Sequence, residues 1–306
     1  METIADYNPA TQSQRRRFLG SHEAAILVLG AVLGLASALI PRSRGPAGDL
    51  LWRLELTSYD WRLRMRAVRP RSEKITIVGV DNTSLQLIGS WPWPREYHAE
   101  LIRALQEAGA RVIVFDMLFD LPSSREPVVN GVSRDDLVFA RAIRDAGNVV
   151  LICELLRESQ GRGDFAISSE TLLRPYDLLA RDALGIGVAL VPEDVDGVVR
   201  RVKLLFDVPQ QEEQIPFVGA VAAAAAEGEK PATLLAPWLA HSHHRHPWMD
   251  DADYLIDYRA PPTSAFTYVP YADVLTGRAS PDLLRGRVVF VGMRSGLEPD
   301  LKLHPV

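Results

Sequence analysis

The sequence predicts an α/β protein with a mixed, mainly parallel sheet flanked by helices, preceded by one transmembrane helix. Residues 75–81 and 111–116 are β-like runs that each end in an aspartate, and an amphipathic helical stretch lies between them. A strand, a crossover helix and a second strand form the parallel unit of such sheets. The transmembrane helix is predicted by residues 24–40, which carry no charged side chain.

Composition bounds the function without naming it. The chain has 306 residues, of which 47% are hydrophobic and 24% charged, so it can bury a core, and we expect one large domain. A net charge of -5 gives no reason to expect a nucleic-acid partner. The single cysteine, Cys153, lies in an apolar run and excludes an internal disulfide. We expect it to be a buried thiol, which does not identify the compartment.

The uncharged run 24–40 has two leading interpretations, and a buried core helix is a third that its lack of polar residues beside three arginines disfavours. At ~1.5 Å per residue its ~17 residues span ~26 Å, slightly less than a ~30 Å hydrocarbon core, so it spans if its flanks reach the interfaces. Arginines precede it at 15–17 and follow it at 42, 44 and 53, so charge hardly sets the orientation. The alternative is a cleaved export signal, because residues 15–19 resemble a twin-arginine motif and 36–38 a cleavage site. Either interpretation exports the remainder.

Two segments near the membrane bear on whether the chain associates with a second copy. Small residues at Gly30, Gly34 and Ala38 share one helix face, so two copies of the chain can approach closely in lipid. Residues 42–48 are rich in Pro, Gly and Arg and are typical of a linker. Residues 50–68 then predict an amphipathic helix, which either caps the sheet or contacts the membrane surface or a second copy.

The middle of the chain continues the alternation of elements. Residues 122–132 are typical of a loop, 135–146 predict a helix and 148–155 a third parallel strand. Residues 185–191 and 198–208 are extended runs on either side of an Asp-Gly turn signal. We expect them to form a hairpin that extends the sheet with antiparallel strands.

The last third predicts one helix against the sheet and two late strands. Residues 217–227 are Ala-rich, so this helix can pack closely. Residues 254–258 and 287–292 predict strands with a short helix at 271–275 between them. The run Val288–Gly292 is apolar on both faces and therefore belongs near the sheet centre.

Candidate site residues follow from the strand ends. Ligands of open parallel sheets gather at the carboxyl ends of strands, where Asp81 and Asp116 lie. Three roles are open for these acids: they coordinate a hard cation, contact a ligand, or only cap the loops at the strand ends. If they converge, a cation or an arginine must offset their like charges, and Arg95 and Arg200 are the candidates. Salt bridging among these four residues is the structural alternative.

Two aromatic side chains in the proline-rich segment 91–95 have two interpretations. Trp91 and Trp93 either offer a ring face to a ligand or pack the loop against the core, while proline fixes the start of the next helix. We favour the packing role, which also holds Arg95 in place.

Metal chemistry has weak support. Asp194, Asp196 and Gly197 resemble the start of a calcium loop, but the rest of that pattern is missing and a tight turn is the simpler reading. The loop before Pro247 holds closely spaced imidazoles that favour adventitious metal binding rather than a specific site. They are His241, His243, His244 and His246. No phosphate loop, nucleophile elbow, kinase or cyclase motif occurs, so we expect no enzyme and no cofactor.

The chain resembles the second class of CHASE-type extracellular sensory domains over roughly residues 50–303. The matching segments are 59–62, Asp81 with 84–85, 89–95, 109–110, 115–116 with Phe119, 194–200, 268–273 and 288–292. The resemblance implies a cytoplasmic amino terminus. The expected organisation is a cytoplasmic tail at 1–21, an anchor at 22–41, a linker at 42–49 and an extracytoplasmic sensory domain at 50–306. The candidate ligand-binding residues are then Asp81, Trp91, Trp93, Arg95, Asp116, Phe119, Asp196 and Arg200.

What the resemblance implies is a single-pass inner-membrane sensor. It binds a small ligand or senses an envelope condition, forms a homodimer, and relays the signal to a cytoplasmic cyclase or kinase, in the same chain if this is a fragment or in a partner. Two alternatives remain: a structural envelope protein that dimerises, and an exported metal-dependent hydrolase using Asp81, Asp116 and Asp196.

Overall fold

The computed structural model describes residues 30, 46–123, 132–160, 167–194, 196–208, 213–240, 252–258, 260 and 262–294. The chain divides into two compact units, Met1–Thr57 and Ser58–Val306. The predicted anchor at 22–41, apart from Gly30, and the histidine loop lie outside the described residues. Among the residues that are described, none of the helices combines the length and the apolar character that a membrane crossing needs.

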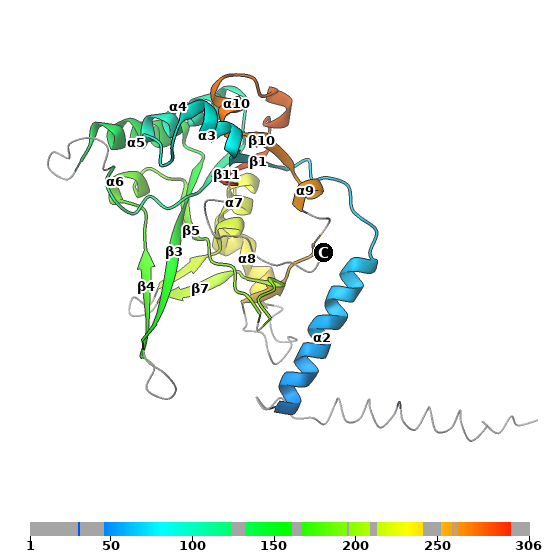
Figure 1. Ribbon diagram of the computed structural model, residues 1–306. Helices are drawn as coiled ribbons and strands as arrows, with labels where there is room; N and C mark the ends of the chain where they lie inside the picture. The colour runs from blue at the N-terminus through cyan, green and yellow to red at the C-terminus, as the bar shows by residue number, and fades with distance from the viewer. Residues whose placement is uncertain are drawn as a thin grey trace, which may run out of the picture. The chain divides into compact units, whose positions relative to one another are not determined.

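A mainly parallel sheet organises the second unit, which confirms the predicted α/β class (Figure 1). Five strands lie side by side, all parallel, and the fifth also pairs with one parallel and one antiparallel strand. The five are, in order, β10 (Thr267–Pro270), β1 (Ile75–Val80), β11 (Val288–Met293), β2 (Val112–Asp116) and β3 (Val149–Gln160); the two others are β5 (Gly185–Val188), which is parallel, and β4 (Ile167–Leu173), which is antiparallel.

The last strand enters the middle of the sheet. β11 pairs with β1 on one side and β2 on the other, so Gly292 lies opposite both Gly79 and Asp116. This confirms the central position predicted from its apolar faces. It also means that β1 and β2, although joined by one crossover, are not neighbours.

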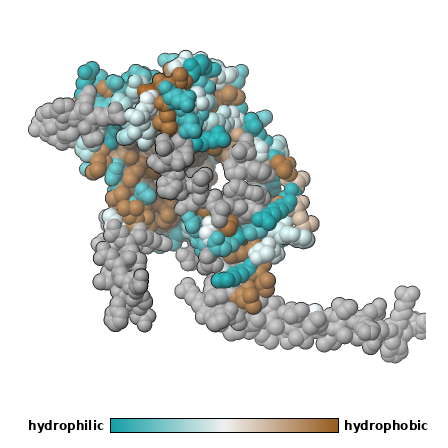
Figure 2. Space-filling model, viewed as in Figure 1, coloured by the Kyte–Doolittle hydropathy of each residue, from teal (hydrophilic) through white to brown (hydrophobic). Residues whose placement is uncertain are grey.

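Helices cover both faces of the sheet. Alternate residues of β2 point to opposite faces, so Ile113 and Phe115 pack in one cluster with the helices α4 and α5, and Val112 and Val114 in another with α7. Hydrophilic residues cover much of the outer surface of the helices at the top of Figure 2. The helices of the first face are α3 (Asn82–Ile88), α4 (Arg95–Glu107), α5 (Arg134–Ala146), α6 (Asp177–Ala180) and α10 (Tyr271–Leu275).

The helix α7 (Val218–Glu227) packs against β5 as the Ala-rich sequence predicted. A Cβ atom added at Gly187 would lie 2.5 Å from the Cα atom of Val218, so glycine is what allows the two backbones this approach. After α7 the chain continues through α8 (Pro231–Ala240), α9 (Pro262–Ala265) and the 3-10 helix η3 (Pro281–Leu283).

The hairpin expected from residues 185–208 is wrong. β5 pairs in parallel with β3, whereas β6 (Arg201–Lys203) pairs with β9 (Asp253–Leu255) and β7 (Leu205–Val208) with β8 (Glu213–Pro216). The tight turn itself forms, because Gly197 N–H donates to the Asp194 carbonyl at 2.9 Å and its φ is 76°. The turn leads out of the main sheet because close packing on α7 holds β5 beside β3.

The helix α2 (Pro46–Met65) occupies most of the segment predicted to be amphipathic. Its residues from Ser58 onward belong to the second unit and pack on it: Leu63 is buried and the Tyr59 hydroxyl donates to the carbonyl of Ile256. Trp61 and Met65 are exposed on the same helix end. This helix end therefore contacts its own domain on one side and leaves apolar side chains uncovered on another.

Candidate functional site

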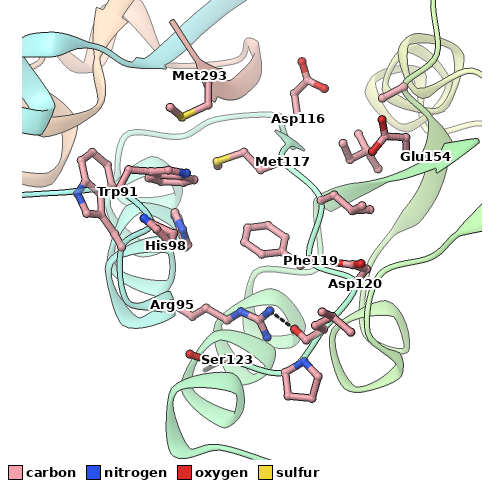
Figure 3. A pocket seen from close by; sticks show the side chains of 17 residues that line it. Trp91, Arg95, His98, Asp116, Met117, Phe119, Asp120, Ser123, Glu154 and Met293 are labelled. Atoms are coloured by element: carbon pink, nitrogen blue, oxygen red, sulfur yellow. Dashed lines mark hydrogen bonds between the residues drawn. The ribbon is translucent and has the colours of Figure 1, made fainter. Parts of the chain in front are cut away.

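A cavity of about 600 Å³ lies at the carboxyl ends of the central strands (Figure 3). Its volume falls in the range of small-molecule sites, and its position is where open parallel sheets bind ligands. One wall consists of residues at or just after the ends of β11, β2 and β5, and of residues in β3 that lie just past its pairing with β2. The segment 117–123 and residues from the range 91–98 complete the lining. These residues are Met293 of β11, Asp116 of β2, Ile152 and Glu154 of β3, and Ala189 after β5.

The two tryptophans play different parts. Trp93 is 5% exposed, donates its Nε1–H to the Gly89 carbonyl at 2.9 Å and packs on Tyr271 with ring centroids 4.9 Å apart. Trp91 is half-buried and lies edge-on to Trp93, at 5.3 Å between centroids. Both line the cavity. Trp93 therefore fixes the loop, as favoured from the sequence, and Trp91 presents the more accessible ring.

Arg95 is buried at the start of α4 and holds the segment after β2 in place. Its guanidinium group forms an ion pair with the buried Asp136 of α5 and donates to the carbonyl of Leu121. It also lies over the Phe119 ring, 5.5 Å from the centroid. The same Asp136 carboxylate accepts from Ser123 N–H at 3.2 Å. Arg95 thus links α4, α5 and the segment 117–123. The sequence offered Asp81 and Asp116 as its ion-pair partners, whereas the structure pairs it with Asp136.

Asp135 caps α4 from the neighbouring helix. Its carboxylate accepts from the backbone N–H groups of Arg95 and Glu96, each at 2.8 Å, and from the Ser123 hydroxyl at 2.8 Å. Pro94, the residue before α4, makes no capping hydrogen bond with its side chain. A carboxylate at this position satisfies amide groups that the helix leaves open and complements its dipole. The cavity wall is therefore fixed by charge as well as by packing.

His98 lies in an aromatic cage below the tryptophans. Its ring centroid is 5.4 to 5.9 Å from those of Phe115, Phe119, Phe139 and Tyr271, and its Nδ1 is 2.8 Å from the Tyr271 hydroxyl. Burial, reinforced by the positive charge of Arg95, lowers the pKa of His98 to about 3. The imidazole is therefore neutral at physiological pH. Burial likewise raises the pKa of the Tyr271 hydroxyl.

Carboxylates occupy the opposite side of the cavity from the tryptophan. In Figure 3, Trp91 and His98 lie on one side and Asp116 and Glu154 on the other, with Met117 between them. Asp116 and Glu154 are exposed and Asp120 is half-buried. These three acids and Arg95 are the formally charged residues among the cavity's described lining.

Asp81 does not line this cavity. It caps α3, because its carboxylate accepts from Ser84 N–H at 2.8 Å, and β11 separates its strand from that of Asp116. It also lies near Tyr268, whose pKa is raised to about 12 by burial first and by Asp81 second. Asp81 and Asp116, whose convergence the sequence left open, therefore lie on strands that β11 separates.

Arg200 and Asp196 form a separate cluster. Arg200 is 2% exposed and forms ion pairs with Asp60 of α2 at 2.7 Å, Asp194 at 3.0 Å and Asp196 at 2.7 Å. The hydrogen bond from Arg200 lowers the pKa of Asp196. Neither Arg200 nor Asp196 is among the described lining of the cavity. The cluster holds the turn that contains Asp194 and Gly197 and joins the end of α2 to β6.

The described residues contain no group of three or more His, Cys, Asp or Glu side chains placed to hold a metal ion. The imidazoles at 241–246 lie outside those residues. Asp81, Asp116 and Asp196, the acids of the hydrolase alternative, belong to three different environments. Buried Cys153 has the packing predicted for it, and burial raises its pKa to about 11.

Several lining and supporting residues were missed by reasoning from sequence. One local signal existed: Ser133 and Asp136 form a capping box at the start of α5, with the Ser133 oxygen 3.0 Å from Asp136 N. That pattern could have placed a carboxylate at a helix start, but not its bond to Arg95. The missed residues are His98, Asp120, Ser123, Asp135, Asp136 and Glu154.

Comparison with known proteins identifies a family. The model of the CHASE2 domain matches residues 27–306, nearly the whole chain. No curated protein and no solved structure matched the sequence.

Proposed function

Because the chain belongs to the CHASE2 domain family of extracellular sensory domains, we propose that it binds a small organic ligand in the carboxyl-edge cavity and relays that event across a membrane. The observation that carries the proposal is the cavity itself, which has the volume of a small-molecule site and is lined by Trp91 and by polar groups of fixed geometry. The proposed location is the periplasmic side of the inner membrane, with residues 22–41 as a single anchor.

The proposed relay is a shift between two packings of the cavity wall. A ligand that contacts the segment 117–123 also acts on α4 and α5, because Arg95 and Asp136 tie that segment to both helices. At another part of the unit, the Asp60–Arg200 ion pair joins the end of α2 to β6. A ligand signals only if it favours one packing over the other. A homodimer and a cytoplasmic cyclase or kinase, in cis or in trans, complete the proposed pathway.

A thermal-melting experiment on the full chain in detergent tests the proposal. The panel contains metabolites, peptides, nucleotides and divalent cations, because a ligand at 100-fold its dissociation constant stabilises a protein by ~2.7 kcal/mol. We expect an organic compound to raise the melting temperature, and Trp91→Ala to abolish the rise. Trp238→Ala, at an exposed tryptophan of α8, is the matched control and should keep it.

The outcomes separate the functions. A shift with metal ions alone, lost in Asp116→Ala, would promote the hydrolase. The absence of any shift would favour the structural alternative, which the exposed Trp61 and Met65 support as a contact surface for a second copy.

A further inference from the structure

The charge of the cavity lining points to a class of ligand, an inference that rests on the proposed function. Among the lining residues that the structure describes, Asp116, Asp120 and Glu154 contribute three carboxylates and Arg95 the one guanidinium. We propose that the cavity takes an organic amine, with its ammonium group on the side of Asp116 and Glu154 and its apolar body against Trp91, Met117 and Met293. The cavity defines the site, and the charges on its lining define what fits.

Arg95 does not offset this negative charge. Its guanidinium group is in direct contact with the buried Asp136, and its backbone N–H is bound by the buried Asp135. The carboxylates of Asp135 and Asp136 therefore lie next to Arg95 and offset its positive charge. An anionic ligand would have to compete with Asp136 for the guanidinium and would approach the three acids of the lining, whose like charges repel it.

The second basic residue of the lining is also unsuited to an anion. His98 is buried in its aromatic cage and stays neutral, so it adds no positive charge to the cavity. Its Nδ1 is engaged with the Tyr271 hydroxyl at 2.8 Å. Among the described lining residues, the cavity thus offers carboxylates to a cation and no uncompensated positive group to an anion.

The rest of the lining suits an apolar body attached to the cation. The Trp91 ring is half-buried, and the thioether side chains of Met117 and Met293 point into the space between it and Asp116 (Figure 3). Thioethers are polarizable and adapt to irregular ligand shapes. A tryptophan face attracts a cation that comes within about 6 Å of it. A strongly hydrated, purely polar ion would use only one side of this cavity.

Matched compounds test the charge directly. Isothermal titration of the full chain in detergent compares tryptamine with tryptophol and indole-3-propionate, which share an indole ring but end in an amine, an alcohol and a carboxylate. A second pair is 1,5-diaminopentane and glutarate. We expect an amine to bind at least tenfold more tightly than its carboxylate counterpart. Asp116→Asn and Glu154→Gln should each weaken that binding about tenfold, whereas Glu107→Gln, an exposed acid at the far end of α4, should not change it.

Each remaining outcome has a definite meaning. Binding of a carboxylate or an alcohol as tight as that of its amine, with loss in Trp91→Ala, would overturn the amine inference and leave the proposed ligand cavity standing. Amine binding that survives both acid substitutions would overturn the assignment of the ammonium position. If none of the amines binds, the inference fails; if the metabolite panel also produces no shift, the proposed function fails with it.

Discussion

At the scale of single residues, His98 gives the domain a specific dependence on pH. Its pKa is about 3 in the folded protein, below the usual 6.5, so between these values the unfolded chain binds a proton that the folded chain does not. The contribution of His98 to the free energy of unfolding is therefore fully present above pH 6.5. It falls as the pH drops from 6.5 towards 3, by up to ~1.4 kcal/mol per pH unit.

The corresponding prediction compares the protein with His98→Gln. Between pH 7.5 and 5.5 we expect the free energy of unfolding of the unaltered protein to fall by about 1.4 kcal/mol more than that of the variant, because only the former takes up this proton on unfolding. Urea unfolding at the two pH values measures it. The variant can be less stable at pH 7.5 without affecting the test, because only the change in unfolding free energy between the two pH values is compared. Equal changes in the two proteins would refute the lowered pKa of His98.

At the same scale, Gly187 tests how closely β5 and α7 pack. A methyl group at this position would meet backbone atoms of Val218 at 2.5 and 2.8 Å, so Gly187→Ala is expected to destabilise the protein by about 3 kcal/mol. Gly277→Ala is the control: its φ is 68° and no atom lies within 4 Å of the added group, so only ~1 kcal/mol of backbone strain is expected. Thermal melting of both variants measures the two losses of stability. Equal losses would show that the close contact of Gly187 with α7 does not account for the effect.

At the scale of elements, the Arg200 cluster joins the end of α2 to β6. Arg200 and Asp194 are almost fully buried, and Arg200→Met leaves the Asp194 carboxylate with only the guanidinium of Arg201, at 3.1 Å, to offset its charge. We expect a cost of about 3 kcal/mol. Asp196 has a side chain 47% exposed, and Asp196→Asn should cost less than ~1 kcal/mol although it removes a bond to the same arginine. Denaturant unfolding compares the two variants. A small effect of Arg200→Met would mean that α2 is held by packing at Leu63 instead.

At the scale of the whole molecule, the proposed topology predicts which cysteines can be labelled in intact cells. Arg103→Cys places a thiol on an exposed position of α4, and a membrane-impermeant maleimide should reach it. Native Cys153 is fully buried, and its raised pKa keeps it a thiol, so the unaltered protein should stay unlabelled. Asp6→Cys, in the predicted cytoplasmic tail, should react only after permeabilisation. Labelling of Asp6→Cys but not of Arg103→Cys in intact cells would show that the chain has the opposite orientation in the membrane.

The sequence by itself determined what local patterns encode. Periodicity predicted the unit from β1 to β2, the helices α5 and α7 and the central place of β11, because each depends on which faces of a short segment are apolar. The same patterns indicated the carboxyl edge of the sheet as the place to seek a site, and the structure has its cavity there. The family resemblance was also contained in local motifs and is confirmed by the match over residues 27–306.

Only the tertiary structure decided which charges meet. Arg95 pairs with an aspartate 41 residues away and Arg200 with one 140 residues away, and nothing in the spacing of these residues distinguishes Asp136 and Asp60 from other acids of the chain. The insertion of β11 separated Asp81 from Asp116, and the packing of β5 under α7 replaced the expected hairpin. A local pattern fixes the face that a residue presents, whereas its partner depends on strand order and on the geometry of segments distant along the chain.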